Sequence, residues 1–205
     1  MGRTVGATAE GTRRKLLRAA ADVFAARGYD GTRVADIASA AGLSNSALYC
    51  YFTSRAELLI GALRAHGRRP LEELVARFPT RSVGDLLLQT GAALRREQGP
   101  ESFLAVEALI AARHHDEVVA ALHDYLGERA DWLAALVREG QAGGELDPAL
   151  SPQAVAHFCL ALAAGTTLIS PDLHDVDDQD WVDLLIRVIA SLEPARAPRE
   201  IGTHA

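Results

Sequence analysis

Apolar residues recur along the chain at intervals of three and four, the period of amphipathic helices. Leu16, Leu17, Ala20 and Phe24, for example, fall on one face of a helix over residues 12–27. Alternating apolar and polar runs, which would indicate strands, do not occur. The pattern therefore predicts an all-α protein of about nine helices. They are expected over residues 12–27, 33–41, 45–51, 54 to beyond 63, 84–96, 103–113, 118–140, 151–169 and 180–193.

Capping residues and glycines divide these helices from one another. The candidate N-caps are Thr12, Thr32, Ser44, Ser54 and Ser151. Gly28 and Gly42 end the first two helices, and Pro70 either kinks the fourth helix or restarts it. We therefore expect a flexible arm over residues 1–10, a first domain over 11–53, a helical second domain over 54–193 and a disordered tail over 194–205.

Charge is distributed unevenly along the 205 residues. The net charge is −6, but residues 1–70 hold 11 basic and five acidic residues, a net +6, so the remaining 135 carry −12. A basic first third on an acidic body suggests a polyanionic partner for that third. Two cysteines are too few for a disulfide framework, and no apolar stretch approaches the roughly 20 residues of a membrane span. These features predict a cytoplasmic protein without a membrane segment.

Residues 33–52 have the spacing of a helix-turn-helix. The small Ala38 lets the two short helices cross closely, Gly42 supplies the turn, and Leu43 and Leu48 point into the crossing. The helix over 12–27 then forms the third wall of a small core. This arrangement leaves the last of the three helices free to enter the major groove of DNA with its N-terminal residues foremost.

Polar side chains on and around this last helix suit contact with DNA. Its N-terminus offers hydroxyls, an amide and free backbone N–H groups, to which phosphates bind favourably. Arg33 and Arg55 flank the unit and can pair with phosphates, while Tyr49 and Tyr51 each offer a ring and a hydroxyl. The candidate DNA-binding residues are Thr32, Arg33, Ser44, Asn45, Ser46, Tyr49, Tyr51 and Arg55.

Residues 12–64 resemble the N-terminal DNA-binding domain of TetR-type (TetR/AcrR) transcriptional regulators. The resemblance rests on Phe24, Gly28-Tyr29, Thr32, Asp36-Ile37-Ala38, Ala41-Gly42-Leu43-Ser44, Leu48-Tyr49 and Tyr51-Phe52. Two positions depart from the family pattern. Arg55 replaces the lysine that is usual in the family and keeps its charge. Asn45-Ser46 replaces the pair of residues that is commoner in the family, so the base preference of family members cannot be transferred to this chain.

The resemblance implies a homodimer that binds a palindromic DNA operator, represses transcription and leaves the DNA when a small-molecule effector binds. It implies neither a cofactor nor a metal. The dimer interface would be formed by the helices over 151–169 and 180–193. Candidate effector-binding residues lie between residues 84 and 140: Leu87, Phe103, Glu107, Tyr125, Trp132 and Leu136. Glu107 could instead be an exposed carboxylate on a helix flank, and Trp132 a core residue.

Other functions stay open at this point. The DNA-binding unit could be controlled by a protein partner, or by oxidation of Cys50 on the third helix. Alternatively, the chain could be a helical small-molecule-binding protein with a vestigial helix-turn-helix. An enzyme has no support, because the sequence lacks nucleophile-elbow and phosphate-loop motifs. His114, His115 and His123 do not have the spacing of a metal site.

Overall fold

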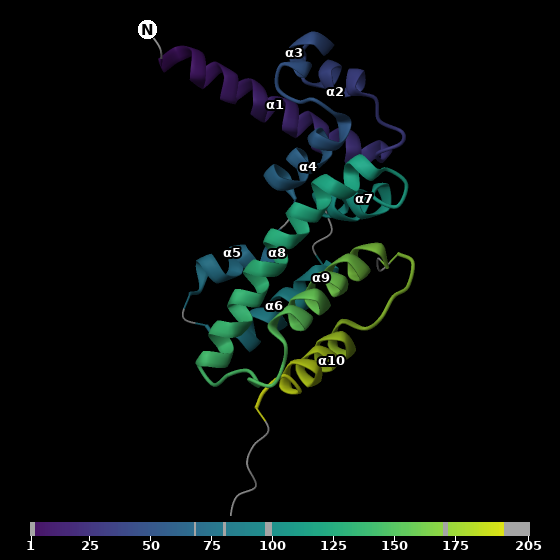
Figure 1. Ribbon diagram of the computed structural model, residues 1–205. Coiled ribbons are helices and arrows are strands. Elements are labelled where there is room, and N and C mark those ends of the chain that lie inside the picture. Colours follow the sequence, from purple (N-terminus) through teal and green to yellow (C-terminus); the bar gives the residue numbers. More distant parts are fainter. Residues whose placement is uncertain (1–2, 68, 80, 97–99, 170–171, 195–205) are drawn as a thin grey trace, which may run out of the picture.

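The computed structural model describes residues 3–67, 69–79, 81–96, 100–169 and 172–194, and these residues form ten α-helices, one 3-10 turn and no strand (Figure 1). The all-α prediction is therefore confirmed. In chain order the helices are α1 (Arg3–Arg27), α2 (Val34–Ala40), α3 (Asn45–Tyr49), α4 (Arg55–His66), α5 (Pro70–Arg77), α6 (Val83–Arg96), α7 (Phe103–Ala111), α8 (Asp116–Ala142), α9 (Pro152–Leu168) and α10 (Asp178–Ala190). The 3-10 turn, Pro100–Ser102, directly precedes α7.

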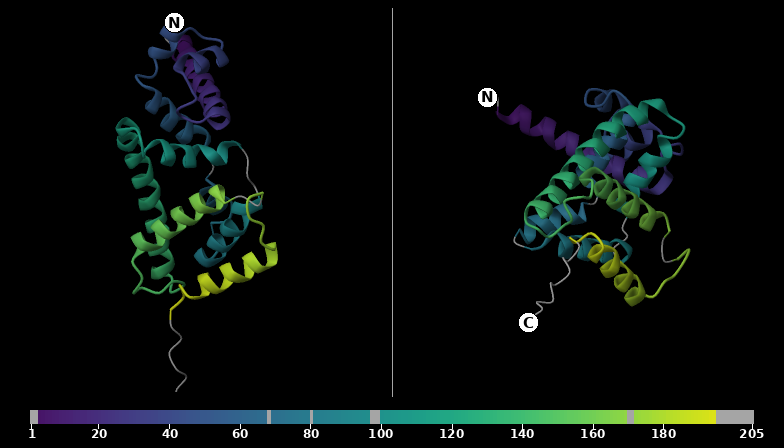
Figure 2. Two further views of the ribbon diagram at one scale, coloured as in Figure 1. Left: turned by 90° about the vertical axis from the view of Figure 1, so that its right-hand side faces the viewer. Right: turned by 60° about the horizontal axis from the view of Figure 1, so that its bottom comes forward.

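Helices α1 to α4 pack into a compact head at one end of the molecule (Figures 1 and 2). Phe24 of α1, Ile37 of α2 and Leu48 of α3 are each at most 1% exposed and meet in its centre. Gly28 and Gly42 end α1 and α2 with φ angles of 69°, a left-handed conformation that favours glycine. The helix-turn-helix predicted from the sequence is thus present.

Helix α1 begins nine residues earlier than the sequence predicts. Residues 3–10, expected to be a flexible arm, are helical, and Thr12 lies inside α1 rather than at its cap. Gly6, Gly11 and the missing apolar face argued against a helix there. Once the buried face from Leu16 onward has nucleated the helix, however, adding further turns costs little.

The predicted caps are confirmed at three of the remaining positions. The hydroxyls of Ser44, Ser54 and Ser151 accept hydrogen bonds from the backbone N–H groups of Ala47, Glu57 and Ala154. Thr32 is not a cap, because α2 begins after Arg33. Pro70 restarts the chain as α5, which accounts for the tenth helix.

The remaining helices form a body below the head, with the long α8 running between the two (Figure 2). The head core continues into α7 and the first half of α8, through Leu104, Val118 and Leu122. A second core joins α5, α6, α9 and the second half of α8 around Leu86 and Val137. The head therefore shares one hydrophobic core with α7 and α8. Most of the predicted tail, residues 195–205, lies outside the described residues.

Candidate nucleic-acid interface and effector cavity

Helix α3 presents a polar face to solvent. Leu48 anchors the helix and is fully buried, whereas Ser44, Asn45 and Ser46 at its N-terminus are exposed. Tyr49, one turn along, is 55% exposed, and Tyr51 just beyond the helix is half-buried. A short helix held by one buried leucine, with its polar N-terminus free, can approach the edges of base pairs.

Exposed cations flank this face. Arg33 directly precedes α2 and is exposed, and its backbone N–H donates to Asp36 Oδ2 at 3.1 Å. Arg13, Arg14 and Lys15 are exposed on α1, where the Arg13 guanidinium lies 5.3 Å from the ring centre of Phe52. These groups are placed to contact phosphates, which supply most of the sequence-independent affinity for DNA.

Two of the predicted DNA-binding residues make contacts within the α1–α2 loop. Thr32 has no exposed surface, and its hydroxyl donates to the carbonyl oxygen of Gly28 at 2.7 Å. The Arg55 guanidinium donates to the carbonyl oxygen of Thr32 at 3.0 Å and lies 3.9 Å from the ring centre of Tyr29. Thr32 is therefore enclosed by the protein, whereas the Arg55 side chain remains 28% exposed. Both residues contact the α1–α2 loop.

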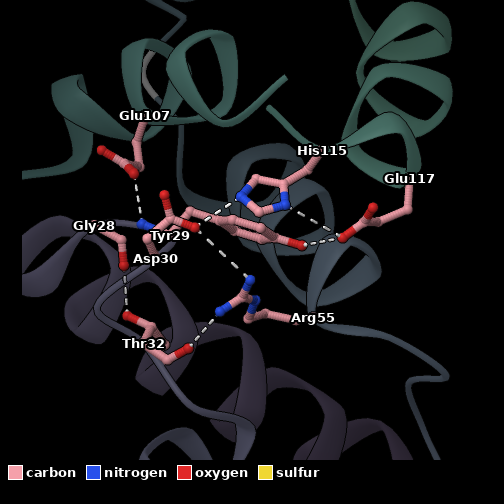
Figure 3. A network of polar contacts seen from close by, with 8 residues as sticks. All are labelled: Gly28, Tyr29, Asp30, Thr32, Arg55, Glu107, His115 and Glu117. Atoms are coloured by element: carbon pink, nitrogen blue, oxygen red, sulfur yellow. Dashed lines mark hydrogen bonds and ion pairs between the residues drawn. The ribbon is translucent and has the colours of Figure 1, made fainter. Parts of the chain in front are cut away.

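Figure 3 shows the polar contacts that residues of α7 and α8 make with this loop. The backbone N–H of Tyr29 donates to Glu107 Oε1 on α7 at 2.5 Å, and its hydroxyl donates to Glu117 Oε1 on α8 at 3.2 Å. His115 Nε2, at the start of α8, lies 2.7 Å from Asp30 Oδ1. The α1–α2 loop is thus bound to the corner between α7 and α8 by contacts at both its backbone and its side chains.

The electrostatics of this network follow from its burial and its hydrogen bonds. Desolvation raises the pKa of Tyr29, and the adjacent Arg55 opposes that shift only in part. The pKa of Glu117 is lowered, first by a hydrogen bond with its own backbone and also by the Tyr29 hydroxyl. Near neutral pH, Tyr29 is therefore a neutral donor and Glu117 a charged acceptor, the states that this hydrogen bond requires.

A cavity of about 550 Å³ lies among helices α6 to α10. Its lining is mostly aliphatic, and it includes Leu87 and Leu94 of α6, Val106 and Leu109 of α7, and Leu133 of α8. This volume lies within the range of pockets that bind small molecules, about 300–1,000 Å³. Helices α7 and α8, which grip the α1–α2 loop, also form walls of the cavity.

Comparison with known proteins decides the family. Residues 16–62 match the model of "Bacterial regulatory proteins, tetR family", and residues 80–188 match "Tetracyclin repressor-like, C-terminal domain". The chain belongs to the TetR family. It is 30% identical to the HTH-type transcriptional repressor BepR of Brucella suis over 211 residues, covering 98% of this chain and 99% of BepR.

Two further relatives span most of this TetR-family protein. The HTH-type transcriptional regulator UidR of Escherichia coli K12 is 25% identical over 176 residues, which cover 84% of this chain and 85% of UidR. The solved structure of Salmonella enterica GusR has a TM-score of 0.75 and 23% identity, covering 89% of this chain and 95% of that one. The second domain, as well as the head, therefore has the TetR-family fold.

The cavity of this TetR-family protein contains only part of the predicted effector site. Leu87 and Tyr125 line it, but Phe103, Glu107 and Leu136 do not. Phe103 is 40% exposed at the start of α7, Leu136 is buried in the second core, and Glu107 is bonded to Tyr29. Trp132 lines a neighbouring cleft of about 400 Å³ beside α5, which shares Tyr125 and Arg129 with the cavity. Helical period alone could not tell which face of α7 or α8 borders the cavity.

The residues that sequence reasoning missed are Tyr29, Asp30, His115 and Glu117. The sequence places Gly28-Tyr29 in the family motif and gives no role to His115, which lacks the spacing of a metal ligand. Their partners lie 78 to 88 positions away in the chain, so no local spacing joins them. An aromatic residue directly after a helix-ending glycine was the one available signal, because such a residue commonly packs back onto the core.

Among the described residues of this TetR-family protein, no helix is both long enough and apolar enough to cross a membrane. Cys50 follows α3 and is exposed, with its thiol donating to the carbonyl oxygen of Ser46 at 3.3 Å. Cys159 on α9 is half-buried, and burial raises the pKa of its thiol to about 11. Cys159 also lines the cavity.

Proposed function

We propose that this TetR-family protein is a repressor that binds a palindromic operator as a homodimer and releases it when a small molecule occupies the cavity among α6 to α10. The observation that carries the proposal is the exposed polar N-terminus of α3 on a head whose core is continuous with α7 and α8. The head can therefore contact DNA while it packs against α7 and α8, two helices that line the cavity.

The homodimer is supported by apolar side chains exposed on the last two helices. They are Phe158 and Leu168 of α9, and Leu184 and Ile186 of α10, each 46% to 52% exposed. Large apolar side chains left in water on two helices are typical of an interface. A second copy related by a twofold axis would cover this surface and present two α3 helices, which explains why we expect a palindromic operator.

Release of DNA is supported by the grip of α7 and α8 on the α1–α2 loop. Both helices line the cavity, and both contact the loop through Glu107, His115 and Glu117. A ligand that binds better to a different arrangement of α7 and α8 would shift the head along with them. The distance between the two α3 helices in a dimer would then no longer fit successive major grooves.

The first test is selection of bound fragments from random duplex DNA, followed by gel shift at several salt concentrations. We expect an enriched palindrome with two half-sites. Asn45→Ala is expected to change the preference among operator variants, whereas Arg33→Ala is expected to weaken binding to all sequences and reduce the salt dependence. No enrichment, with binding that disappears at modest salt, would contradict the proposal. Release by oxidation in wild type but not in Cys50→Ser would favour control by redox instead.

A further inference from the structure

The cavity among α6 to α10 is lined by few charged side chains, and these already pair with other residues of the protein. In the described part of its lining, the charged side chains are Glu101 and Arg129, apart from the exposed His123 and His157. Glu101 accepts a hydrogen bond from Arg18 of α1 at 2.8 Å. Arg129 is 16% exposed and donates to Glu72 of α5 at 2.7 Å. Both charges are therefore already paired with residues of the protein.

Apart from the exposed His123 and His157, the described lining therefore offers no unpaired charge to a charged occupant. A carboxylate or ammonium group that enters an aliphatic cavity loses its hydration and needs an opposite charge to replace it. Arg129 could turn fully toward an anion only by giving up its 2.7 Å contact with Glu72, which would keep only the longer contact with Arg69 at 3.3 Å. The lining therefore disfavours ions of either sign and accepts apolar surface.

One hydroxyl in the lining has no partner. Thr90 of α6 lines the cavity, and its Oγ1 is buried without a hydrogen bond within the described structure. Thr167 of α9 also lines the cavity, but its hydroxyl donates to the carbonyl oxygen of Ala163 at 3.0 Å. A threonine in a helix has two accessible χ1 rotamers, so Thr90 can turn its hydroxyl toward a bound molecule. A buried hydroxyl left unpaired is costly, and an occupant with an acceptor would remove that cost.

From these observations we infer that the effector is an uncharged, mainly apolar molecule carrying a hydroxyl or carbonyl group that hydrogen-bonds to Thr90. This inference rests on the proposed function, since it names the class of ligand that the same cavity takes. The aliphatic walls provide most of the affinity through burial, and Thr90 fixes the end of the molecule that bears the oxygen.

Calorimetric titration of the full-length protein tests the inference without DNA. The probes are decan-1-ol, decanoate and decylammonium, which share a chain and differ in charge. We expect decan-1-ol to bind at least about tenfold more tightly than either ion. Thr90→Val is expected to weaken decan-1-ol binding about three- to tenfold, the usual range for one hydrogen bond. Thr167→Val is the comparison variant and is expected to weaken binding less than Thr90→Val, because the Thr167 hydroxyl already donates to the carbonyl oxygen of Ala163.

Three results would overturn the inference: an ion that binds as tightly as the alcohol, equal effects of Thr90→Val and Thr167→Val, or no binding of decan-1-ol up to its solubility limit. Circular dichroism confirms that each variant is folded. A parallel gel shift on the selected operator separates this inference from the proposed function. Binding of the alcohol without DNA release supports the chemistry of the cavity and contradicts its role as the effector site.

Discussion

Gly42 shows how a single residue fixes the reading helix. It lies in the turn between α2 and α3 with a φ angle of 69°, and a Cβ built on it meets no atom within 4 Å. The requirement for glycine is therefore one of backbone conformation and not of space. We expect Gly42→Ala to lower the free energy of unfolding by about 1–2 kcal/mol, the cost of a left-handed conformation for an L-residue. Urea denaturation measures it.

Gly127 supplies the control for this prediction. It lies inside α8, has no positive φ angle, and also has open space around an added Cβ. Gly127→Ala is therefore expected to raise stability by about 0.5–1 kcal/mol, because alanine loses less entropy in a helix. If both variants changed stability in the same direction, the argument from φ would be wrong.

Cys159 gives the protein a predicted dependence on alkaline pH. Burial raises the pKa of its thiol from 9.0 to about 11. The unfolded chain ionises first as pH rises, so the stability contributed by the neutral thiol is complete below pH 9 and is lost as pH approaches 11. Between pH 8 and pH 10.5, we expect the free energy of unfolding of Cys159→Ala to fall by about 2 kcal/mol less than that of wild type, as measured by urea denaturation. Identical losses in the two proteins would contradict the raised pKa.

At the scale of elements, the contact between the α1–α2 loop and α7 depends on Glu107. Its carboxylate accepts the backbone N–H of Tyr29, a residue that is 1% exposed. Glu107→Ala would leave that N–H buried without a partner, and we expect it to lower the free energy of unfolding by about 1–3 kcal/mol. Glu107→Gln keeps an acceptor oxygen, so we expect a smaller decrease in the free energy of unfolding. Hydrogen exchange at the Tyr29 amide measures the contact directly and is expected to accelerate most in the alanine variant.

A comparison variant distinguishes this contact from an ordinary surface pair. Glu128 on α8 pairs with Arg64 at an exposed position, with Arg64 Nη2 2.9 Å from Glu128 Oε1. Exposed pairs contribute at most about 1 kcal/mol. Glu128→Ala is therefore expected to leave Tyr29 exchange unchanged. If Glu107→Ala had no more effect on that amide than Glu128→Ala, Glu107 would not hold the loop.

The sequence predicted the elements better than the contacts between them. Helical period and capping residues located most helices, since both depend on neighbours within four positions, as with Ser44 and Ser151. The early start of α1 was missed, because it depends on a helix nucleated further along the chain. The contacts that Arg55 and Glu107 make with the α1–α2 loop could not be predicted, because this loop meets them only in the folded protein.

At the scale of the whole molecule, two regions with different tasks share α8. Its N-terminal end joins the head core and binds the α1–α2 loop through Glu117, while its middle lines the cavity. Further along, it packs against α9 in the second core, and α9 exposes part of the apolar surface assigned to a second copy. A ligand in the cavity therefore contacts a helix that reaches from the reading head toward the proposed interface.

The proposed dimer is the feature of the whole molecule on which the proposed recognition of a palindromic operator depends. We expect the double substitution Leu168→Glu and Leu184→Glu to raise the dimer dissociation constant by at least about 100-fold. A twofold interface buries each new charge twice, without a partner. Sedimentation velocity measures the change. Leu173→Glu, in the loop between α9 and α10 where the leucine is 76% exposed, is the matched control and keeps the dimer. A double variant that remained dimeric at the concentrations at which wild type is dimeric would place the interface elsewhere. A variant that became monomeric but still bound the full palindrome with wild-type affinity would show that one head suffices.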